Sequence, residues 1–298
     1  MLKKLKYKDI TWLDLESPTE EEVRQLGEDY GVHPIVLEEL VKPSQRTKVD
    51  VYNGYVYLIL HFPFPESEGK EVDFVLGKDF LITTHYEGIN PLHDFARIFE
   101  TDFTLKRGVE KLHAGYIFFY IMREFYAALE ADLHSVNDQL KKVERKVFSG
   151  HEREVVEVLA ALNRTILDFR WSLKSHREIL ESLKIVGPEL YGEKFHFYFQ
   201  SLANEEEKLW NMVENIRETF TDLRDTNDSL LAIKTNDIMR ALTVAAFIFL
   251  PLTVIPQAFG MSLPVPFHDS PAGFVIVVGF MALASSCLYL LARYKKWF

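Results

Sequence analysis

Hydrophobic residues gather toward the C-terminal end of this chain, where two long segments contain no charged side chain. These segments cover residues 241–259 and 272–292. A helix of about 20 apolar residues, rising about 1.5 Å per residue, crosses the ~30 Å hydrocarbon core of a membrane. The pattern therefore predicts two transmembrane helices, at about residues 239–259 and 272–292.

The first of these two segments has a polar side. One set of positions repeats at spacings of three and four residues, which keeps its members on one face of a helix. The set consists of Asn236, Met239, Leu242, Ala246, Leu250, Thr253 and Gln257. Polar residues in a membrane helix usually face protein or water rather than lipid. Because one helix cannot enclose a water-filled path, the pattern indicates several copies of the chain around a common axis.

The N-terminal region, residues 1–107, alternates strand and helix signals, which predicts an α/β domain with a mostly antiparallel sheet. Strands are predicted at residues 10–15, 48–52, 55–62, 72–76 and 80–84. Short helices are predicted after Ser17, from Pro34 to Val41, and from Pro91 to Phe99. For the first helix we predict Ser17 as the N-cap, Pro18 at the first helical position and Glu20 closing a capping box.

Residues 108–235 lose the strand signals and become helical. Two amphipathic segments cover residues 109–148 and 152–185, the second ended by Gly187-Pro188, and a third begins near Glu193. The third has an apolar stripe of near-heptad spacing, which predicts packing against other helices. The stripe consists of Leu202, Leu209, Val213, Ile216, Phe220, Leu223, Asn227 and Leu230.

A helical bundle in a soluble domain is the simpler interpretation of this region. We favour a stalk, because the third helix continues without a strong breaker into the first apolar segment, up to Pro251. The expected fold class is therefore α+β: a cytosolic α/β domain, a long helical stalk and two C-terminal transmembrane helices. The expected divisions are residues 1–107, 108–235 and 236–298.

Net charge, cysteine count and missing motifs argue against several classes of function. The net charge is −10, so no basic surface for nucleic acid is indicated. The single cysteine, Cys287, allows neither an internal disulfide nor a CxxC zinc site. No HExxH, Walker or GxGxxG motif stands out, so neither an enzyme nor an organic cofactor is predicted.

The third helix carries a surplus of acidic residues between positions 201 and 235, and repetition around an axis would make that surplus attract cations. A solvated helix face is the simpler explanation for most of them. The acids are Glu205, Glu206, Glu207, Glu214, Glu218, Asp222, Asp225 and Asp228, against the bases Lys208, Arg217, Arg224 and Lys234.

Basic residues also predict the orientation in the membrane. Lys234 and Arg240 precede the first span, and Arg293, Lys295 and Lys296 follow the second. The loop between the spans has no Lys or Arg. The positive-inside rule therefore places both termini in the cytoplasm of a multi-pass protein of the cell membrane. The first residues lack the apolar core of a signal peptide, so we expect the first span to direct insertion.

The first apolar segment and its flanks carry a dense set of motif residues: Asn236, Met239, Arg240, Leu242, Thr243, Ile248, Phe249, Pro251, Thr253, Gly260, Met261 and Ser262. This set resembles the first membrane helix of the CorA family of divalent-cation channels, in which Ser262 replaces the signature asparagine. The runs TWLDLESPTEEEV and VHPIVLEEL resemble the cytosolic domain of the family more loosely, and the tail YKKWF resembles its basic ending.

This resemblance implies a homopentamer that transports Mg²⁺, with Co²⁺ and Ni²⁺ as further ions, and closes when intracellular Mg²⁺ binds between cytosolic domains. It does not assign the regulatory carboxylates residue by residue. It implies a pore with Gly260, Met261, Ser262, Thr253 and Gln257 as the selectivity region. Met239, Leu242 and Leu250 are then the hydrophobic gate, and Asn236 and Ala246 line the pore.

The chemistry of Mg²⁺ fits neutral oxygen groups, because this ion keeps much of its hydration water when bound. A serine hydroxyl both donates and accepts hydrogen bonds, so a Ser262 ring suits hydrated cations. Two alternatives remain. His268 beside Asp269 in the outer loop favours a zinc transporter of the same superfamily. A membrane-anchored scaffold or signalling module would use the hairpin only as an anchor.

Overall fold

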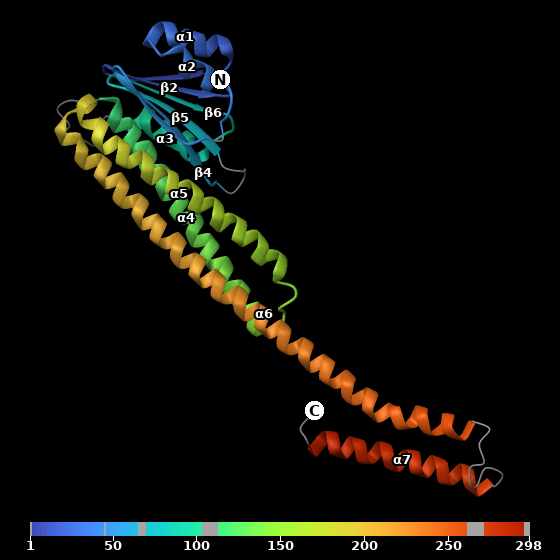
Figure 1. Cartoon of the computed structure of the whole chain (residues 1–298). Helices are drawn as coiled ribbons and strands as arrows, with labels where there is room; N and C mark the ends of the chain where they lie inside the picture. Colours follow the sequence, from blue (N-terminus) through green and yellow to red (C-terminus); the bar gives the residue numbers. More distant parts are fainter. Residues whose placement is uncertain (1, 45, 65–69, 103–112, 261–270, 295–298) are drawn as a thin grey trace. The chain divides into compact units, whose positions relative to one another are not determined.

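The computed structural model describes residues 2–44, 46–64, 70–102, 113–260 and 271–294 (Figure 1). The chain divides into two compact units, Met1–Leu223 and Arg224–Phe298. The first unit contains a sheet covered by helices and a bundle of long helices. The second contains the end of one long helix and a further apolar helix.

The sheet of the first unit has six strands in the order β1-β2-β6-β5-β4-β3. They are β1 (Leu2–Tyr7), β2 (Ile10–Glu16), β3 (Lys48–Tyr52), β4 (Tyr55–Phe62), β5 (Lys70–Gly77) and β6 (Phe80–His85). Neighbouring strands are antiparallel except β2 and β6, which run parallel. The predicted fold class, with a mostly antiparallel sheet and two apolar C-terminal helices, is confirmed.

All five predicted strands are present, and β1 was not predicted. Its sequence LKKLKY carries three lysines among two leucines and a tyrosine, and only Leu5 is buried. Lysines are a common protection of an edge strand, because they discourage pairing with another chain. The hairpin at Asn53-Gly54 joins β3 and β4, and Gly54 has a φ of +97°. A glycine adopts this left-handed conformation without strain.

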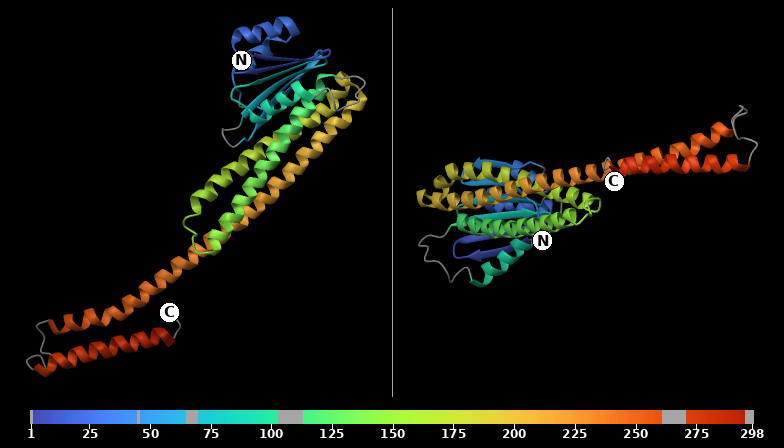
Figure 2. Two further views of the ribbon diagram at one scale, coloured as in Figure 1. Left: turned by 180° about the vertical axis from the view of Figure 1, so that it is seen from behind. Right: turned by 90° about the horizontal axis from the view of Figure 1, so that it is seen from below.

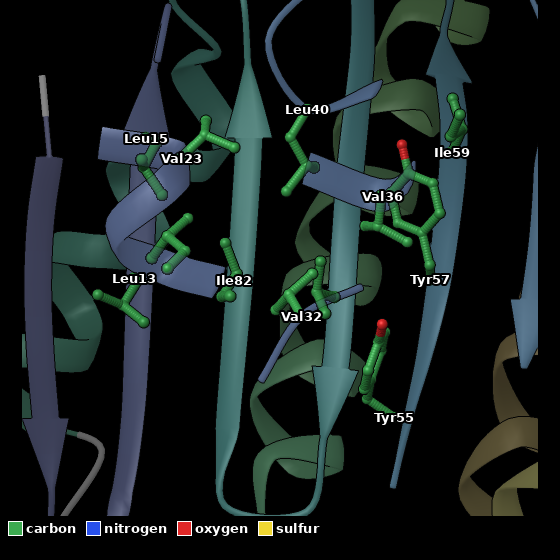
Figure 3. Packing of buried hydrophobic residues seen from close by; sticks show 12 residues of the cluster. Leu13, Leu15, Val23, Val32, Val36, Leu40, Tyr55, Tyr57, Ile59 and Ile82 are labelled. Atoms are coloured by element: carbon green, nitrogen blue, oxygen red, sulfur yellow. The ribbon is translucent and has the colours of Figure 1, made fainter. Parts of the chain in front are cut away.

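The first core lies between the sheet and two short helices, α1 (Glu20–Tyr30) and α2 (Pro34–Glu39). Figure 3 shows Val36 and Leu40 reaching the sheet from the α2 side, over Tyr57 and Ile82. Alternation along each strand places every second side chain on this face. Val36 and Leu40 are fully buried, which attaches this helical pair to the sheet through the hydrophobic effect.

The predicted cap of α1 is wrong by two residues. Thr19, not Ser17, is the N-cap. Its side chain accepts a hydrogen bond from the backbone N–H of Glu22, and its own backbone N–H donates to the Glu22 carboxylate at 2.9 Å. Ser17 is engaged elsewhere, because its N–H donates to the His85 carbonyl at 2.7 Å and its hydroxyl to the Tyr86 carbonyl at 2.9 Å. The helix therefore uses the capping box of Thr19 and Glu22, while Ser17 is held by the chain segment that follows β6.

The opposite face of the sheet is covered by α3 (Asn90–Asp102), α4 (Ala114–Phe148) and α5 (Val156–Tyr191). Aromatic rings fill this second core. The Trp12 ring of β2 lies 5.5 Å from the rings of Phe95 and Phe99, and Phe74 of β5 meets Phe118 edge-on at 5.2 Å. Edge-to-face geometry of this kind is favoured by the quadrupoles of the rings.

The next helix, α6 (His196–Gly260), follows a short 3-10 turn and packs its first part beside α4 and α5 (Figure 2). The apolar stripe predicted for it is buried through the first unit. The members buried in the first unit are Leu202, Leu209, Val213, Ile216, Phe220 and Leu223, and Asn227 of the second unit is buried as well. Period and burial agree here, as expected for a helix that buries one face in a bundle.

The predicted end of α5 at Gly187-Pro188 is wrong, because the helix continues to Tyr191. Pro188 lacks an N–H, yet its own carbonyl accepts from the Gly192 N–H at 2.8 Å and closes the last turn. Gly187 has a packing role instead: the Phe199 ring lies where a Cβ on Gly187 would be. Packing against the start of α6 outweighs the local breaker.

The cap assignment yields a test of stability. Replacing Thr19 with alanine removes the capping hydroxyl and is expected to lower the free energy of unfolding by about 1 kcal/mol. Thermal or chemical unfolding of the full-length protein in detergent measures the loss. The control is Thr165→Ala in α5, whose hydroxyl only bonds back to the Ala161 carbonyl, and which is expected to change stability by less than about 0.5 kcal/mol. Equal losses in the two variants would contradict the assignment.

Candidate functional site

The C-terminal unit is built from two helices that are long and apolar enough to cross a membrane, judged by length and composition. They are the end of α6 and α7 (Pro271–Tyr294). Only 6% of the residues in each apolar stretch are buried within the chain. Side chains of this kind require another apolar environment, either lipid or further copies of the same helices.

The two helices contact each other along one side of α6. Val244 is 1% exposed and Ala292 of α7 is 5% exposed. The Ser285 hydroxyl of α7 donates to the Ile248 carbonyl at 3.4 Å. Val244 and Ile248 are four residues apart and therefore share a face. This contact was not predicted, because Val244 resembles any other apolar residue of the segment.

The face of α6 that carries the predicted stripe is exposed within the chain. Met239, Leu242 and Leu250 are 57%, 63% and 59% exposed. The other members are exposed too: Asn236, Ala246, Thr253 and Gln257. At 3.6 residues per turn, this face lies on the opposite side of the helix from Val244 and Ile248. The seven residues of the predicted stripe thus share one face of α6, and all seven are exposed within the chain.

The hydroxyl groups on this helix are arranged as hydrogen-bond acceptors toward their surroundings. Thr253 Oγ1 donates to the Leu250 carbonyl at 2.9 Å, and Thr243 Oγ1 to the Met239 carbonyl at 2.7 Å. Because the hydroxyl hydrogen is used within the helix, the remaining lone pairs can only accept. Water bound to a cation directs its hydrogens outward, so such acceptors match a hydrated cation.

The end of the predicted selectivity region falls partly outside the described residues. Gly260 is the last residue of α6, and Pro251 lies inside this helix without interrupting it. Met261 and Ser262 lie outside the described residues, as do His268 and Asp269 of the predicted outer loop.

The acidic residues of α6 fall into two groups. Three of them form ion pairs within the bundle: Glu205 with Arg123 at 3.2 Å, Glu206 with Arg177 at 3.2 Å and Glu214 with Arg170 at 2.6 Å. Others are exposed, namely Glu207, Glu218, Asp222, Asp225 and Asp228. Among the described residues of the single chain, no group of three or more His, Cys, Asp or Glu side chains is placed to hold a metal ion.

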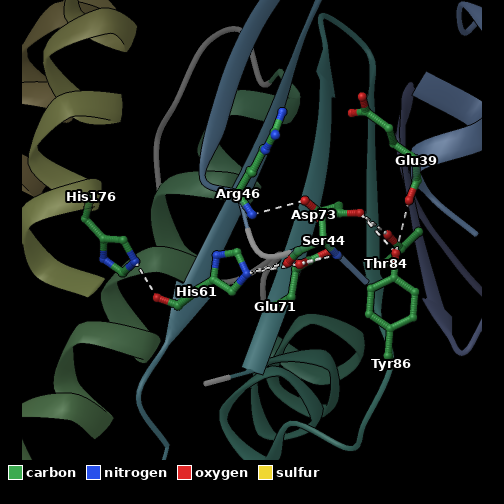
Figure 4. A network of polar contacts seen from close by, with 9 residues as sticks. All are labelled: Glu39, Ser44, Arg46, His61, Glu71, Asp73, Thr84, Tyr86 and His176. Atoms are coloured by element: carbon green, nitrogen blue, oxygen red, sulfur yellow. Dashed lines mark hydrogen bonds and ion pairs between the residues drawn. The ribbon is translucent and has the colours of Figure 1, made fainter. Parts of the chain in front are cut away.

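A polar network on the sheet, missed by sequence reasoning, fixes the connection after α2 (Figure 4). Both carboxylate oxygens of Glu71 accept from the Ser44 N–H, at 2.9 and 2.7 Å. His61 Nε2 lies 3.0 Å from Glu71 Oε2 and 2.8 Å from the Ser44 carbonyl, so this nitrogen is the donor. Glu71 is buried, and these bonds compensate for the loss of its hydration.

Asp73 lies next in the same network and is 1% exposed. Its Oδ2 accepts from the Thr84 hydroxyl at 3.2 Å and from the Tyr86 hydroxyl at 3.4 Å. Burial, and then the neighbouring charge of Glu71, raise the pKa of the Asp73 carboxyl well above its ordinary value. The network joins β5 and β6 to α2, because the Tyr86 hydroxyl also contacts the Glu39 carbonyl. We interpret it as a structural network rather than a transport site.

Comparison with known proteins agrees with this architecture. The family model described as "CorA-like Mg2+ transporter protein" matches residues 7–293. The cobalt/magnesium transport protein CorA of Thermotoga maritima is 28% identical over 295 residues, covering 96% of this chain and 83% of that protein. The solved CorA magnesium transporter of Methanocaldococcus jannaschii has a TM-score of 0.83 at 24% identity, covering 99% of this chain and 94% of that one.

A third likeness concerns the fold alone. The cytoplasmic domain of ZntB from Vibrio parahaemolyticus has a TM-score of 0.62 at 12% identity, covering 76% of this chain and 89% of that one. The family model, in contrast, spans nearly the whole sequence, the apolar hairpin included. The chain therefore belongs to the CorA-like Mg²⁺ transporter family, whose members are transporters and not enzymes.

Proposed function

We propose that this protein is a homopentameric membrane channel for hydrated divalent cations, with Mg²⁺ as the principal ion and Co²⁺ and Ni²⁺ as further ions. One observation carries the proposal. The face of α6 that holds Asn236, Thr253 and Gln257 is exposed in the chain, and Thr253 and Gln257 lie in the otherwise apolar C-terminal part of this helix. Polar groups in such a helix need water or protein beside them. Five copies around an axis supply both.

The proposed path alternates acceptor groups with apolar rings. Thr253 and Gln257 present neutral oxygens that can accept hydrogen bonds from the water around a cation. Gly260, Met261 and Ser262 belong to the proposed selectivity region, with the Ser262 hydroxyls at the outer mouth, while Asn236 and Ala246 line the inner part. Met239, Leu242 and Leu250 form constrictions that close by excluding water. Because Mg²⁺ gives up water reluctantly, a path of this kind conducts it with its shell largely retained.

The first two predicted regions, residues 1–107 and 108–235, are proposed to lie in the cytosol together with both chain ends. The basis is the placement of Lys234, Arg240 and Arg293 beside the apolar segments. Intracellular Mg²⁺ is proposed to bridge carboxylates of neighbouring copies and to favour the closed state. Its loss then shifts the population toward the open state, which gives negative feedback on influx.

Flux into proteoliposomes tests the channel. With low Mg²⁺ inside, entry of Mg²⁺ well above that into empty vesicles is expected, together with entry of Co²⁺ and Ni²⁺. Zn²⁺ entry measured in the same assay distinguishes a zinc transporter from a magnesium channel, because a zinc transporter must prefer Zn²⁺ over Mg²⁺. Native mass spectrometry in mild detergent is expected to show five copies. A monomer without divalent flux would favour the membrane-anchor alternative.

Thiol labelling tests the uncovered face of α6. In a Cys287→Ala background, Ala246→Cys is expected to react with a charged, membrane-impermeant thiol reagent, and the modification is expected to reduce Mg²⁺ flux to near the level of empty vesicles. The reason is that Ala246 lies on the proposed water-filled side of the helix. Flux before and after labelling is the measurement.

The wild-type cysteine is the matched control. Cys287 is exposed on α7 and lies on the opposite side of that helix from Ser285 and Ala292, which face α6. In the proposed assembly it faces lipid, so the charged reagent is expected to leave it unmodified. Labelling of Cys287 with no labelling at position 246 would contradict the proposed path.

A substitution at the outer mouth tests selectivity. Ser262→Asn is expected to preserve flux and to sharpen the preference for Mg²⁺ over Co²⁺ and Ni²⁺. The longer amide side chain narrows the ring and offers both a donor and an acceptor. Competition of the three ions in the flux assay is the measurement, with the wild type as reference. Unchanged selectivity would remove Ser262 from the filter.

A further inference from the structure

The two apolar helices of the second unit each carry one arginine at the same end of the hairpin, Arg240 on α6 and Arg293 on α7. The helices run in opposite directions (Figure 1), and the hydrogen bond from Ser285 to the Ile248 carbonyl fixes their register. Arg240 lies eight residues before Ile248, and Arg293 lies eight residues after Ser285. Because both helices rise about 1.5 Å per residue, the two arginines lie at about the same level.

Neither of these two arginines has a partner for its charge. Both residues are exposed, and in the described part of the chain neither forms an ion pair or a side-chain hydrogen bond. Asp237 lies one turn before Arg240 on α6, but the two are not ion-paired. Arginines of the bundle, in contrast, are paired with glutamates: Arg123, Arg170 and Arg177. Two positive charges thus stand side by side on packed helices, and their repulsion is unfavourable unless an anion joins them.

The pair lies at the border of the apolar part of the hairpin. Arg240 directly precedes the uncharged segment 241–259, and Arg293 directly follows the uncharged segment 272–292. Tyr294, beside Arg293, is 89% exposed, and tyrosines next to an apolar span typically lie at the level of the lipid headgroups. The two guanidinium groups therefore lie at the depth of the lipid phosphates, next to the apolar surface that the acyl chains cover.

The contact between the helices places both arginines beside their interface. Val244, which is 1% exposed, follows Arg240 by four residues and is about 40° from it around α6. Ala292, which is 5% exposed, directly precedes Arg293, about 100° away around α7. Packed helices have axes about 8–10 Å apart, and the planar head of a long arginine side chain binds phosphate through two parallel hydrogen bonds. Side chains from the two helices can therefore meet on one phosphate.

We propose that Arg240 and Arg293 together bind the phosphate of one anionic membrane lipid. The phosphate supplies the negative charge that the pair lacks, and the acyl chains cover exposed apolar residues such as Leu290 and Leu291 of α7. Basic groups between membrane helices are a common site for anionic headgroups. The bound headgroup joins α6 to α7 at the end opposite their connection. This site needs only one hairpin and goes beyond the proposed ion path, so its failure would leave that path untouched.

Native mass spectrometry of the full-length protein in mild detergent tests the site. Phosphatidylglycerol is expected to bind at about one molecule per chain. Phosphatidylcholine with the same acyl chains is expected to bind at least about tenfold more weakly, because its ammonium group repels the arginines. Arg240→Gln and Arg293→Gln are each expected to weaken the binding of phosphatidylglycerol at least about tenfold. Two bound molecules per wild-type chain, with one retained in each variant, would overturn the shared site.

The matched control is Arg224→Gln, which removes the same charge from α6. Arg224 pairs with Asp225 at 3.2 Å and lies sixteen residues before Arg240, about 24 Å along the helix. Its affinity for phosphatidylglycerol is expected to equal that of wild type. An equal loss in all three variants would show that only the net charge matters, and would overturn the proposal.

The melting temperature separates a lipid from free phosphate. Phosphatidylglycerol is expected to raise the melting temperature of the wild type by a few degrees, because it binds the folded hairpin, and this rise is expected to disappear in Arg240→Gln and Arg293→Gln. Inorganic phosphate at the same concentration is expected to leave the melting temperature unchanged, because it gains nothing from the apolar surface. An equal rise with inorganic phosphate would overturn the assignment to a lipid, and an equal rise in the two arginine variants would exclude these residues from the site.

Discussion

The continuity of α6 is the constraint on which the rest of the molecule depends. Inside a hydrocarbon layer every backbone N–H and carbonyl must be satisfied within the protein, and an unbroken helix does this locally. The same 65-residue helix buries an apolar stripe in the bundle of the first unit and later presents a mixed face in its apolar part. The period of the helix therefore decides which side chains are buried in the bundle and which remain exposed within the chain.

The acidic residues of α6 are likewise divided between those that pair inside the bundle and those that are exposed. Glu206 and Glu214 are paired with arginines of α5, and the two guanidinium groups lie over Trp210. These contacts set the register of α5 against α6, because they recur about every two turns of each helix. The exposed acids further along the helix are free of that task. Formal acidity alone thus says little about cation binding, since part of the surplus is neutralised inside the chain.

Features set by local periodicity could be predicted from the sequence, whereas features set by tertiary contact could not. The strands around Asn53-Gly54, the buried stripe of α6 and the two apolar helices follow from alternation, helical period and length. Ser17 was misinterpreted because Tyr86, distant in sequence, binds its hydroxyl and the neighbouring pair Thr19 and Glu22 caps the helix. Pro188 was misinterpreted because Phe199 of the next helix packs on Gly187. The helical spacing of the stripe on α6 follows from the sequence, but the contact of Val244 with α7 depends on a pair of elements that no sequence period relates.

The single-sided contact between α6 and α7 has a consequence for biogenesis. In the proposed assembly each hairpin would enter the bilayer as a pair of helices, because Val244, Ala292 and Ser285 close it within one chain. A single chain would then leave Thr253 and Gln257 facing acyl chains, where polar groups are poorly solvated. Lateral association relieves that exposure, so the groups proposed to attend a passing ion would also drive the subunits to find one another.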